Sequence, residues 1–563
     1  MNEESKNMLY TLAQRIALIA SIFAIILSIL MIANFIQTKA GDPLNSPALT
    51  KLVGQLKENP GDQALKEQIR ELDLLARKAF FTRRWQLRAA MYALLACLVL
   101  IFASLKAMQN LRPEPAQPPT GEHASWWQLQ SGLRKYTIIA ASALMGIGLV
   151  LSVISNVLWE RPAPEPVAAN VPDVATIEQN WPNFRGPWAN GHAHFTNVPT
   201  EWNGADGTNI KWKAEIPLPG FNSPIVWGDR IFLSGADKTK QMVCCYDLNT
   251  GSLIWEKEIA SMKSADKEPT ADDYTGYAAP SMATDGSHVF VIYATGDIAG
   301  LDLDGNQLWA MNLGVPDNHY GHSSSLICYQ HLLIVQFDDY GNPRLLGLNG
   351  ATGQTVWEQK RNQISWSSPI CVITGKRMEL ILTNSSSVTS FDPLTGKLLW
   401  NNDCLSGEVG ASAAYADGYV YAANEYAIGV AIKIPAPSGD EATIAWEYDD
   451  NLPNASSPLA TDKYLFLATG DGYVSCLNAK TGELFWEHEF DHGMYASAVL
   501  VGELVYLMDL KGVMHIFKAD DEFELVSEPA LGEKSSCTAA IVDGKIVVRG
   551  EKNLYCISVT GNR

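Results

Sequence analysis

Residues 246–255 read YDLNTGSLIW, a polar turn with a glycine followed by a strand that carries a tryptophan. Related phrases are LDLDGNQLW at 301–309, LNGATGQTVW at 348–357, FDPLTGKLLW at 391–400, LNAKTGELFW at 477–486 and the shorter ATIAW at 442–446. Their tryptophans follow one another at intervals of 54, 48, 43, 46 and 40 residues. A period of about 40 to 50 residues, with glycine-bearing turns between apolar strands, is typical of four-stranded β-propeller blades.

A second pattern, two small residues or a small residue and a proline, marks the start of each blade. It occurs at 223–224, 279–280, 324–325, 368–369, 412–413, 457–458, 497–498 and 539–540. In the seventh repeat, Phe523–Val526 stands where a tryptophan strand is expected. We therefore expect an all-β propeller of eight blades, with seven blades as the alternative.

The eighth blade lacks a fourth strand at the C-terminus, since the chain stops soon after 555–559. Residues 209–216 (NIKWKAEI) match 253–259 (LIWEKEI) and precede the first blade. An open blade edge invites aggregation, so we expect the strand at 209–216 to complete the last blade and close the ring.

The repeated phrase has a structural explanation. Asp or Asn before Thr-Gly favours a tight turn, because the side chain bonds to nearby backbone and glycine accepts positive φ. The tryptophan can bury a large apolar surface against the next blade. We therefore assign these residues no chemistry.

The N-terminal part has the composition of a membrane domain, which we place at residues 1–160. Three apolar stretches predict transmembrane helices at about 16–35, 89–105 and 136–158, and 46–81 reads as a helical hairpin. A Pro/Ala linker at 161–175 separates this α-helical membrane domain from the propeller at 176–563.

Charge divides in the same way. Residues 1–160 hold 16 Lys/Arg and 11 Asp/Glu, whereas the remainder holds 26 and 50, a net charge of −24. So acidic a body does not suit a nucleic-acid-binding protein, because phosphates would be repelled. Basic residues in the segment between the first two spans argue against an external propeller, since cytoplasmic loops usually carry the positive charge.

The tryptophan phrases, and WPNFRGP at 181–187 followed by Asn190-Gly191, resemble the PQQ-like (tryptophan-docking) propeller family. The resemblance covers about 175–563. This family includes quinoprotein alcohol and sugar dehydrogenases and the propeller lipoprotein of the barrel-assembly machinery. The resemblance implies a propeller outside the cytoplasm, so we expect a bacterial inner-membrane protein with a periplasmic propeller.

The quinoprotein relatives imply PQQ and calcium as cofactors, a catalytic aspartate and often a vicinal disulfide. Cys244-Cys245 is a vicinal pair, but strand alternation would point its side chains to opposite faces. No haem-attachment motif occurs. The candidate carboxylates in the turns between strands are Asp297, Asp338, Asp339, Glu425, Asp471 and Asp509, and spacing selects none of them. The catalytic residues therefore stay unknown, and no cofactor is assigned.

The loops that enter the blades carry aromatic and histidine side chains, which we expect to meet at one mouth of the ring. These candidate rim residues are Phe221, Tyr274, Tyr277, His319, Tyr320, His322, Trp366, His492 and Tyr495. Such a rim suits ligand or peptide recognition, and it also suits plain loop packing. His319 and His322 have no identifiable third ligand, so no metal site is predicted.

Three functional hypotheses follow from these observations. The first is a non-catalytic, membrane-anchored scaffold whose partners are proteins that bind at the rim and in the membrane. The alternative is a PQQ-dependent oxidoreductase that feeds electrons to the membrane chain. A third hypothesis is a sensor that couples an external ligand to the hairpin.

Overall fold

The computed structural model describes residues 3–40, 94, 97–111, 171–262, 267–375, 377–425, 427–435 and 441–559. The chain divides into two compact units, Met1–Glu160 and Arg161–Arg563.

Among the described residues of the first unit, α1 (Glu3–Ala40) is the one long helix. Its window Met8–Ile25 is long and apolar enough to cross a membrane, with a mean hydropathy of 1.7. Ser21 and Ser28 donate to the carbonyls four residues earlier, so their hydroxyls are satisfied within the helix. α1 thus contains the whole of the predicted first span, 16–35.

The other predicted spans have less support. A shorter apolar helix, Cys97–Asn110, overlaps the predicted span at 89–105. The predicted span at 136–158 and the hairpin at 46–81 lie outside the described residues. Within the described part of the chain, one helix meets the length requirement where the sequence predicted three spans.

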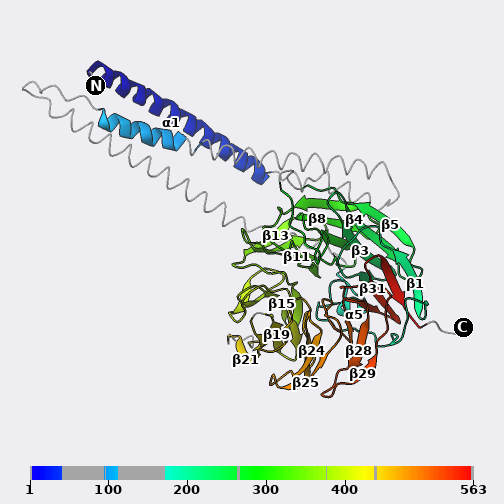
Figure 1. Ribbon diagram of the computed structural model, residues 1–563. Helices are drawn as coiled ribbons and strands as arrows, with labels where there is room; N and C mark the ends of the chain where they lie inside the picture. The colour runs from blue at the N-terminus through cyan, green and yellow to red at the C-terminus, as the bar shows by residue number, and fades with distance from the viewer. Residues whose placement is uncertain are drawn as a thin grey trace, which may run out of the picture. The chain divides into compact units, whose positions relative to one another are not determined.

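The described part of the second unit begins with the short helix α5 (Val174–Glu178), capped by Asp173, whose carboxylate accepts from the backbone N–H of Thr176. Eight four-stranded antiparallel sheets then form the ring drawn in Figure 1, which confirms the eight-bladed propeller.

The first four blades are consecutive along the chain. Their strands are β2 (Ile225–Trp227), β3 (Arg230–Ala236), β4 (Gln241–Asp247), β5 (Leu253–Glu258); β6 (Ala283–Thr284), β7 (His288–Ile292), β8 (Asp297–Asp302), β9 (Gln307–Asn312); β10 (Ile327–Tyr329), β11 (Leu332–Phe337), β12 (Arg344–Asn349), β13 (Thr355–Lys360); and β14 (Ile370–Thr374), β15 (Arg377–Thr383), β16 (Val388–Phe391), β17 (Leu398–Asn402).

The last four blades follow in the same order. Their strands are β18 (Ala414–Ala416), β19 (Tyr419–Ala423), β20 (Gly429–Lys433), β21 (Thr443–Tyr448); β22 (Leu459–Ala460), β23 (Tyr464–Ala468), β24 (Tyr473–Asn478), β25 (Leu484–Glu489); β26 (Val499–Val501), β27 (Leu504–Met508), β28 (Met514–Lys518), β29 (Leu525–Ser527); and β30 (Ala540–Val542), β31 (Lys545–Arg549), β32 (Asn553–Ile557) with β1 (Ile210–Glu215).

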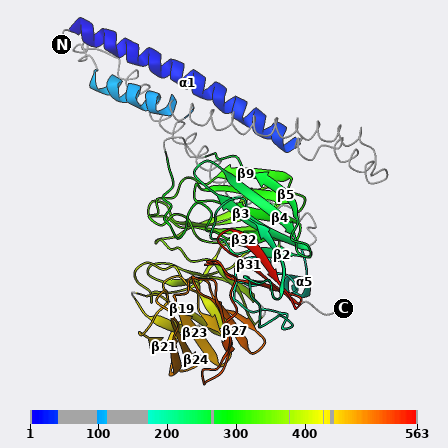
Figure 2. The same cartoon turned by 45° about the vertical axis from the view of Figure 1, so that its right-hand side comes forward.

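The last blade joins the two ends of the propeller sequence. β1 pairs antiparallel with β32, and Trp212 lies opposite Cys556. Figures 1 and 2 show the C-terminal strands, in red, beside the green strands of the first blade. Trp212 also donates to the carbonyl of Leu248 in the first blade, at 2.9 Å. The N-terminal strand therefore completes one blade and fastens it to the next.

Most of the other repeat tryptophans donate in the same way to a carbonyl in the turn of the following blade. Trp255 donates to the carbonyl of Leu303 at 3.0 Å, and Trp309 donates to that of Gly350 at 2.7 Å. Gly305, at φ +85°, lies so close to the Trp255 ring that a Cβ there would come within 2.7 Å of it. The glycine thus meets two demands at once, a positive φ and close approach of an indole.

The innermost edges of the blades are joined by a closed belt of hydrogen bonds. In each blade a backbone N–H donates to a hydroxyl of the next blade, at 2.8–3.0 Å. The members are Ser223, Ser281, Ser325, Ser368, Ser412, Ser457, Ser497 and Thr538, whose N–H returns to Ser223. This belt explains the small polar residues at the blade starts, although the second and eighth blades use residues beside the predicted pairs.

Candidate functional site

The two ends of the central channel differ in construction. The lead-in segment, residues 181–193, contacts the residues at the ends of the innermost strands. Trp181 pairs with Val226 of the first blade, whereas Asn190 bonds the backbone of Tyr415 in the fifth. Contacts with blades on opposite sides of the ring mean that this segment crosses the channel. The candidate rim residues precede the innermost strands, so they lie at the other end.

Arg185 is the central side chain of the lead-in segment. Its guanidinium is fully buried and donates to the carbonyls of Ala413 and Pro458, in the fifth and sixth blades. Burial lowers the pKa of Arg185 to about 9, which still leaves it charged at neutral pH. This end of the channel is therefore closed by a buried, hydrogen-bonded cation.

At the rim, five side chains form what we call the aromatic–carboxylate cluster: His319, Tyr320, Tyr340, Trp366 and Glu408. Glu408 bonds to the His319 Nε2 at 2.9 Å and accepts from the Tyr320 hydroxyl at 2.8 Å. The Tyr340 hydroxyl lies 3.0 Å from the His319 Nδ1, and the two rings stack with centroids 5.8 Å apart. The ring centroid of Trp366 is 5.2 Å from that of His319 and 5.3 Å from that of Tyr320.

The cluster joins loops from three blades and mixes buried with exposed groups. Trp366 is buried and donates to Asn318 Oδ1 at 2.6 Å, which anchors it from below. Tyr340 is 54% exposed, and Glu408 keeps 45% of its side-chain surface. A fixed aromatic base with an exposed carboxylate and phenol on top is suited to binding a ligand group from solution.

A buried polar network lies beside the cluster. Arg361 bonds to Asp338 at 2.8 Å, with both side chains almost fully buried. Asp338 also accepts from Gln336 at 2.9 Å and from Ser365 at 3.1 Å. Burial raises the pKa of Asp338, and the bond to Arg361 opposes that shift without cancelling it. The network fixes the loop that carries Tyr340.

The other predicted rim residues divide into separate groups. Tyr274 and Tyr495 form a ring pair with centroids 5.5 Å apart, and they come from loops of different blades. Phe221 lies against Gly276, where a Cβ would come within 3.2 Å of its ring. Tyr277 packs against the core of the first two blades.

The two remaining histidines do not join the cluster. His322 is buried, and its ring centroid lies 5.2 Å from that of Phe337. Burial lowers the pKa of His322 to about 4, so it is neutral at physiological pH. His492 is exposed, and within the described residues no ring contact joins it to the others. The structure thus brings together three of the nine predicted residues and adds Tyr340 and Glu408.

Tyr340 and Glu408 were not predicted as rim residues. Tyr340 directly follows Asp338-Asp339 in a turn within the third blade, outside the blade-entry loops that the prediction searched. Glu408 does lie in an entry loop, that of the fifth blade, but it is neither aromatic nor histidine.

A PQQ–calcium site would need carboxylates that are available to the ligand. Asp297 is buried and accepts from Asn312, Ser261, Thr295, Gln241 and the backbone N–H of Met262. Asp338 is committed to Arg361, and Asp509 accepts from the backbone of Lys511 and Val513. Among the described residues, no group of three or more His, Cys, Asp or Glu is placed to hold a metal ion. Asp297, Asp338 and Asp509 are therefore engaged within the fold and do not fit the calcium-bound cofactor, whereas Glu425 and Asp471 are exposed.

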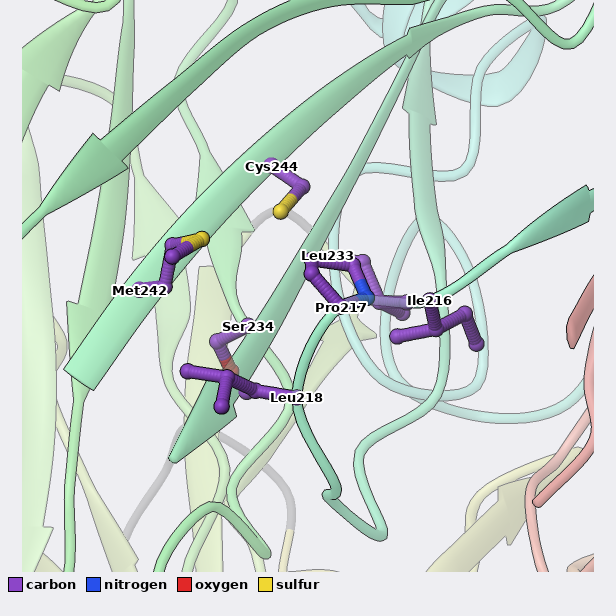
Figure 3. Close-up of a pocket in the computed structure, with 8 residues that line it drawn as sticks. Ile216, Pro217, Leu218, Leu233, Ser234, Met242 and Cys244 are labelled. Atoms are coloured by element: carbon purple, nitrogen blue, oxygen red, sulfur yellow. The ribbon is translucent and has the colours of Figure 1, made fainter. Parts of the chain in front are cut away.

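The vicinal cysteines are structural. Cys244 packs in the core cluster that joins the eighth and first blades, whereas Cys245 packs in the cluster of the first two blades. Both thiols are free, and burial raises their pKa values, to about 11 for Cys244 and about 12 for Cys245. Cys244 lines a small apolar pocket between Leu218, Leu233 and Met242, which is too narrow to admit a water molecule (Figure 3). This pocket offers no charged group for a tricarboxylate quinone.

Comparison with known proteins agrees with this fold. A family model described as outer membrane protein assembly factor BamB matches residues 203–374 and 384–563, more than half of the chain. Quinoprotein ethanol dehydrogenase from Pseudomonas putida is 39% identical over 57 residues, which span 10% of this chain and only 9% of that protein.

Two solved structures are similar at low sequence identity. Quinohemoprotein alcohol dehydrogenase from Comamonas testosteroni is 12% identical, with a TM-score of 0.53 over 72% of this chain and 83% of that chain. BamB from Moraxella catarrhalis is 15% identical, with a TM-score of 0.47 over 62% of this chain and 99% of that chain. At 12% identity, the similarity to the Comamonas structure shows a common fold and not a common activity.

Proposed function

Because this chain belongs to the BamB family of PQQ-like propellers, we propose that it is a non-catalytic interaction scaffold. In this proposal its rim binds a protein partner within a complex of the bacterial envelope. The aromatic–carboxylate cluster is the observation that supports it, since exposed aromatic side chains on a rigid base are typical of interface anchors.

The proposed anchor is the N-terminal domain, residues 1–160. The α1 window Met8–Ile25 supports one spanning helix. We propose two more at about 89–105 and 136–158, with the hairpin at 46–81 as a second docking element and 161–175 as the linker to the propeller. Three spans would place the termini on opposite sides of the membrane, and we propose the inner membrane with the propeller in the periplasm.

Site-specific cross-linking of the full-length protein in its native membrane tests the scaffold role. A photo-reactive phenylalanine analogue would replace Tyr340 in one variant and Phe485 in a matched control. Phe485 is also an exposed aromatic residue, but it lies on β25, the outer strand of the sixth blade. We expect a defined protein adduct from position 340 and none from 485. Equal labelling at both positions, or no adduct at 340, would contradict the proposed rim interaction.

The alternative is a PQQ-dependent oxidoreductase, which is favoured by the similarity to the quinoprotein and quinohemoprotein dehydrogenases. The internal commitment of Asp297, Asp338 and Asp509 speaks against it. Incubation of the full-length protein with PQQ and Ca²⁺, followed by absorbance and mass spectrometry, separates the two functions. Stoichiometric cofactor with dye-linked alcohol or sugar oxidation would overturn the scaffold proposal.

A further inference from the structure

In the aromatic–carboxylate cluster, the negative charge of Glu408 is only partly compensated by neighbouring groups of the protein. Among the described residues, the ion-pair partner of Glu408 is the imidazole of His319, and no lysine or arginine lies within ion-pair distance. Each oxygen of Glu408 bonds one neighbour, His319 or Tyr320, and a carboxylate oxygen can accept more than one hydrogen bond. Glu408 therefore retains acceptor capacity on its exposed side.

A second carboxylate acts on the same surface. Burial raises the pKa of the Tyr340 phenol, and the charges of Glu408 and Asp317 raise it further. Asp317 is exposed, and its carbonyl accepts from the backbone N–H of Tyr340. The exposed face of the cluster therefore combines aromatic rings with two nearby negative charges.

We propose that this cluster binds an arginine side chain presented by the partner, an inference that rests on the proposed scaffold function. A guanidinium is planar, so it can stack on an exposed ring such as Tyr340 while its N–H groups point to Glu408. The guanidinium also carries a positive charge, which complements the negative charge of Glu408. The net charge of −24 over residues 161–563 adds long-range attraction for a basic segment and repels an acidic one.

The test uses two small peptides and the full-length protein in detergent. Acetyl-Gly-Arg-Gly-amide and the same peptide with citrulline differ in charge but hardly in shape. Ligand-observed NMR titration gives the affinity of each. We expect the arginine peptide to bind about fivefold more tightly or better, as an exposed cation–π contact together with a surface ion pair would provide.

The variant Glu408→Gln preserves the size of the side chain and removes its charge. We expect it to reduce arginine-peptide binding to the citrulline level, whereas the matched control Glu483→Gln, an exposed carboxylate in the turn before β25, keeps the preference. Equal binding of the two peptides, or equal loss in both variants, would overturn the arginine site. In the latter case the overall acidic charge explains the binding.

The two proposals fail in different ways. A cross-link at position 340 without an arginine preference leaves the scaffold function standing and overturns the arginine inference. An arginine preference that depends on Glu408, without any protein adduct at 340, supports the cation site and contradicts the protein-scaffold role.

Discussion

The two ends of the propeller channel are made from the same blades, but their polar side chains differ in exposure. At one end they are shielded and bond within the fold, and at the other they stay partly exposed to solvent. At the lead-in end, the side chains of Arg185 and Asn190 are shielded and bond to backbone groups of distant blades, and only the Arg185 Nε is left without a partner among the bonds of these two side chains. At the rim, Glu408 and Tyr340 are held by neighbours but keep about half of their surface in solvent. This difference indicates that the lead-in end stabilises the fold, and it supports the proposal that the rim binds a partner. Substitutions at each end can test the assignment.

The largest effect is expected at the lead-in end. Arg185→Ala should lower the free energy of unfolding by about 3 to 5 kcal/mol, because two buried carbonyls, those of Ala413 and Pro458, lose their donor. Denaturant unfolding of the full-length protein in detergent, followed by tryptophan fluorescence, measures it. The loss of stability for Arg185→Lys should be smaller than that for Arg185→Ala but still measurable, since one ammonium cannot donate equally well to both carbonyls. A loss below about 1 kcal/mol would mean that the segment does not clamp the ring.

The next effect concerns pH at the rim end. Burial lowers the pKa of His322 to about 4 from an unfolded value of 6.5, so the unfolded chain binds the proton first as the pH falls. His322 therefore costs no stability above pH 6.5, and the cost grows to about 3 kcal/mol as the pH falls to 4. His322→Gln should lose less stability than the wild type over this window. Parallel stability–pH curves for the two proteins would show that His322 is not the group responsible.

Asn190 offers a matched comparison within the lead-in segment. It exchanges two bonds of 2.8 Å with the backbone of Tyr415, whereas Asn197 bonds to exposed groups around Asp543. Asn190→Ala should cost about 2 kcal/mol and Asn197→Ala less than about 1 kcal/mol, because only the first leaves groups shielded from water unpaired. Thermal unfolding of both variants measures which substitution costs more stability. A larger loss for Asn197→Ala than for Asn190→Ala would be inconsistent with a closed channel end.

The smallest effect on stability should come from the rim. Tyr340→Ala should change the free energy of unfolding by less than about 1 kcal/mol, because the ring is more than half exposed. Its affinity for the partner that cross-linking identifies should nevertheless fall about tenfold, as expected for an interface anchor. A variant that unfolds readily would instead make Tyr340 part of the structural core of the rim.

Much of the propeller could be predicted from local sequence. The turn phrase at 246–255 and its copies predicted the repeat, and the eight small-residue pairs predicted the number of blades. The prediction worked because a turn that requires Gly251 or Gly305 depends on nearby residues and on one tryptophan of the neighbouring blade. The fourth repeat shows the limit of this rule. There Trp400 donates to the buried carboxylate of Glu379 in its own blade, at 2.8 Å, instead of to the following turn.

The candidate site was less predictable. His319, Tyr320 and Trp366 were found because aromatic and histidine residues in blade-entry loops were expected to meet. His322 and Tyr277 satisfied the same criterion, but the fold buries His322 and packs the partly buried Tyr277 against the core. Orientation of a loop side chain depends on the neighbouring blades, and the local sequence does not contain that information.

The sequence by itself determined the repeat, the number of blades and an apolar N-terminal segment, because each is written in residues close together along the chain. Only the tertiary structure decided which end of the channel is closed and which bears a site. Asn318 and Trp366, or Arg185 and Pro458, meet only after the ring has formed, since 48 and 273 residues separate them. Ring closure brings these distant groups together. The fit of each polar group to its new neighbours then determines whether it is hydrogen-bonded within the protein or stays available to a binding partner.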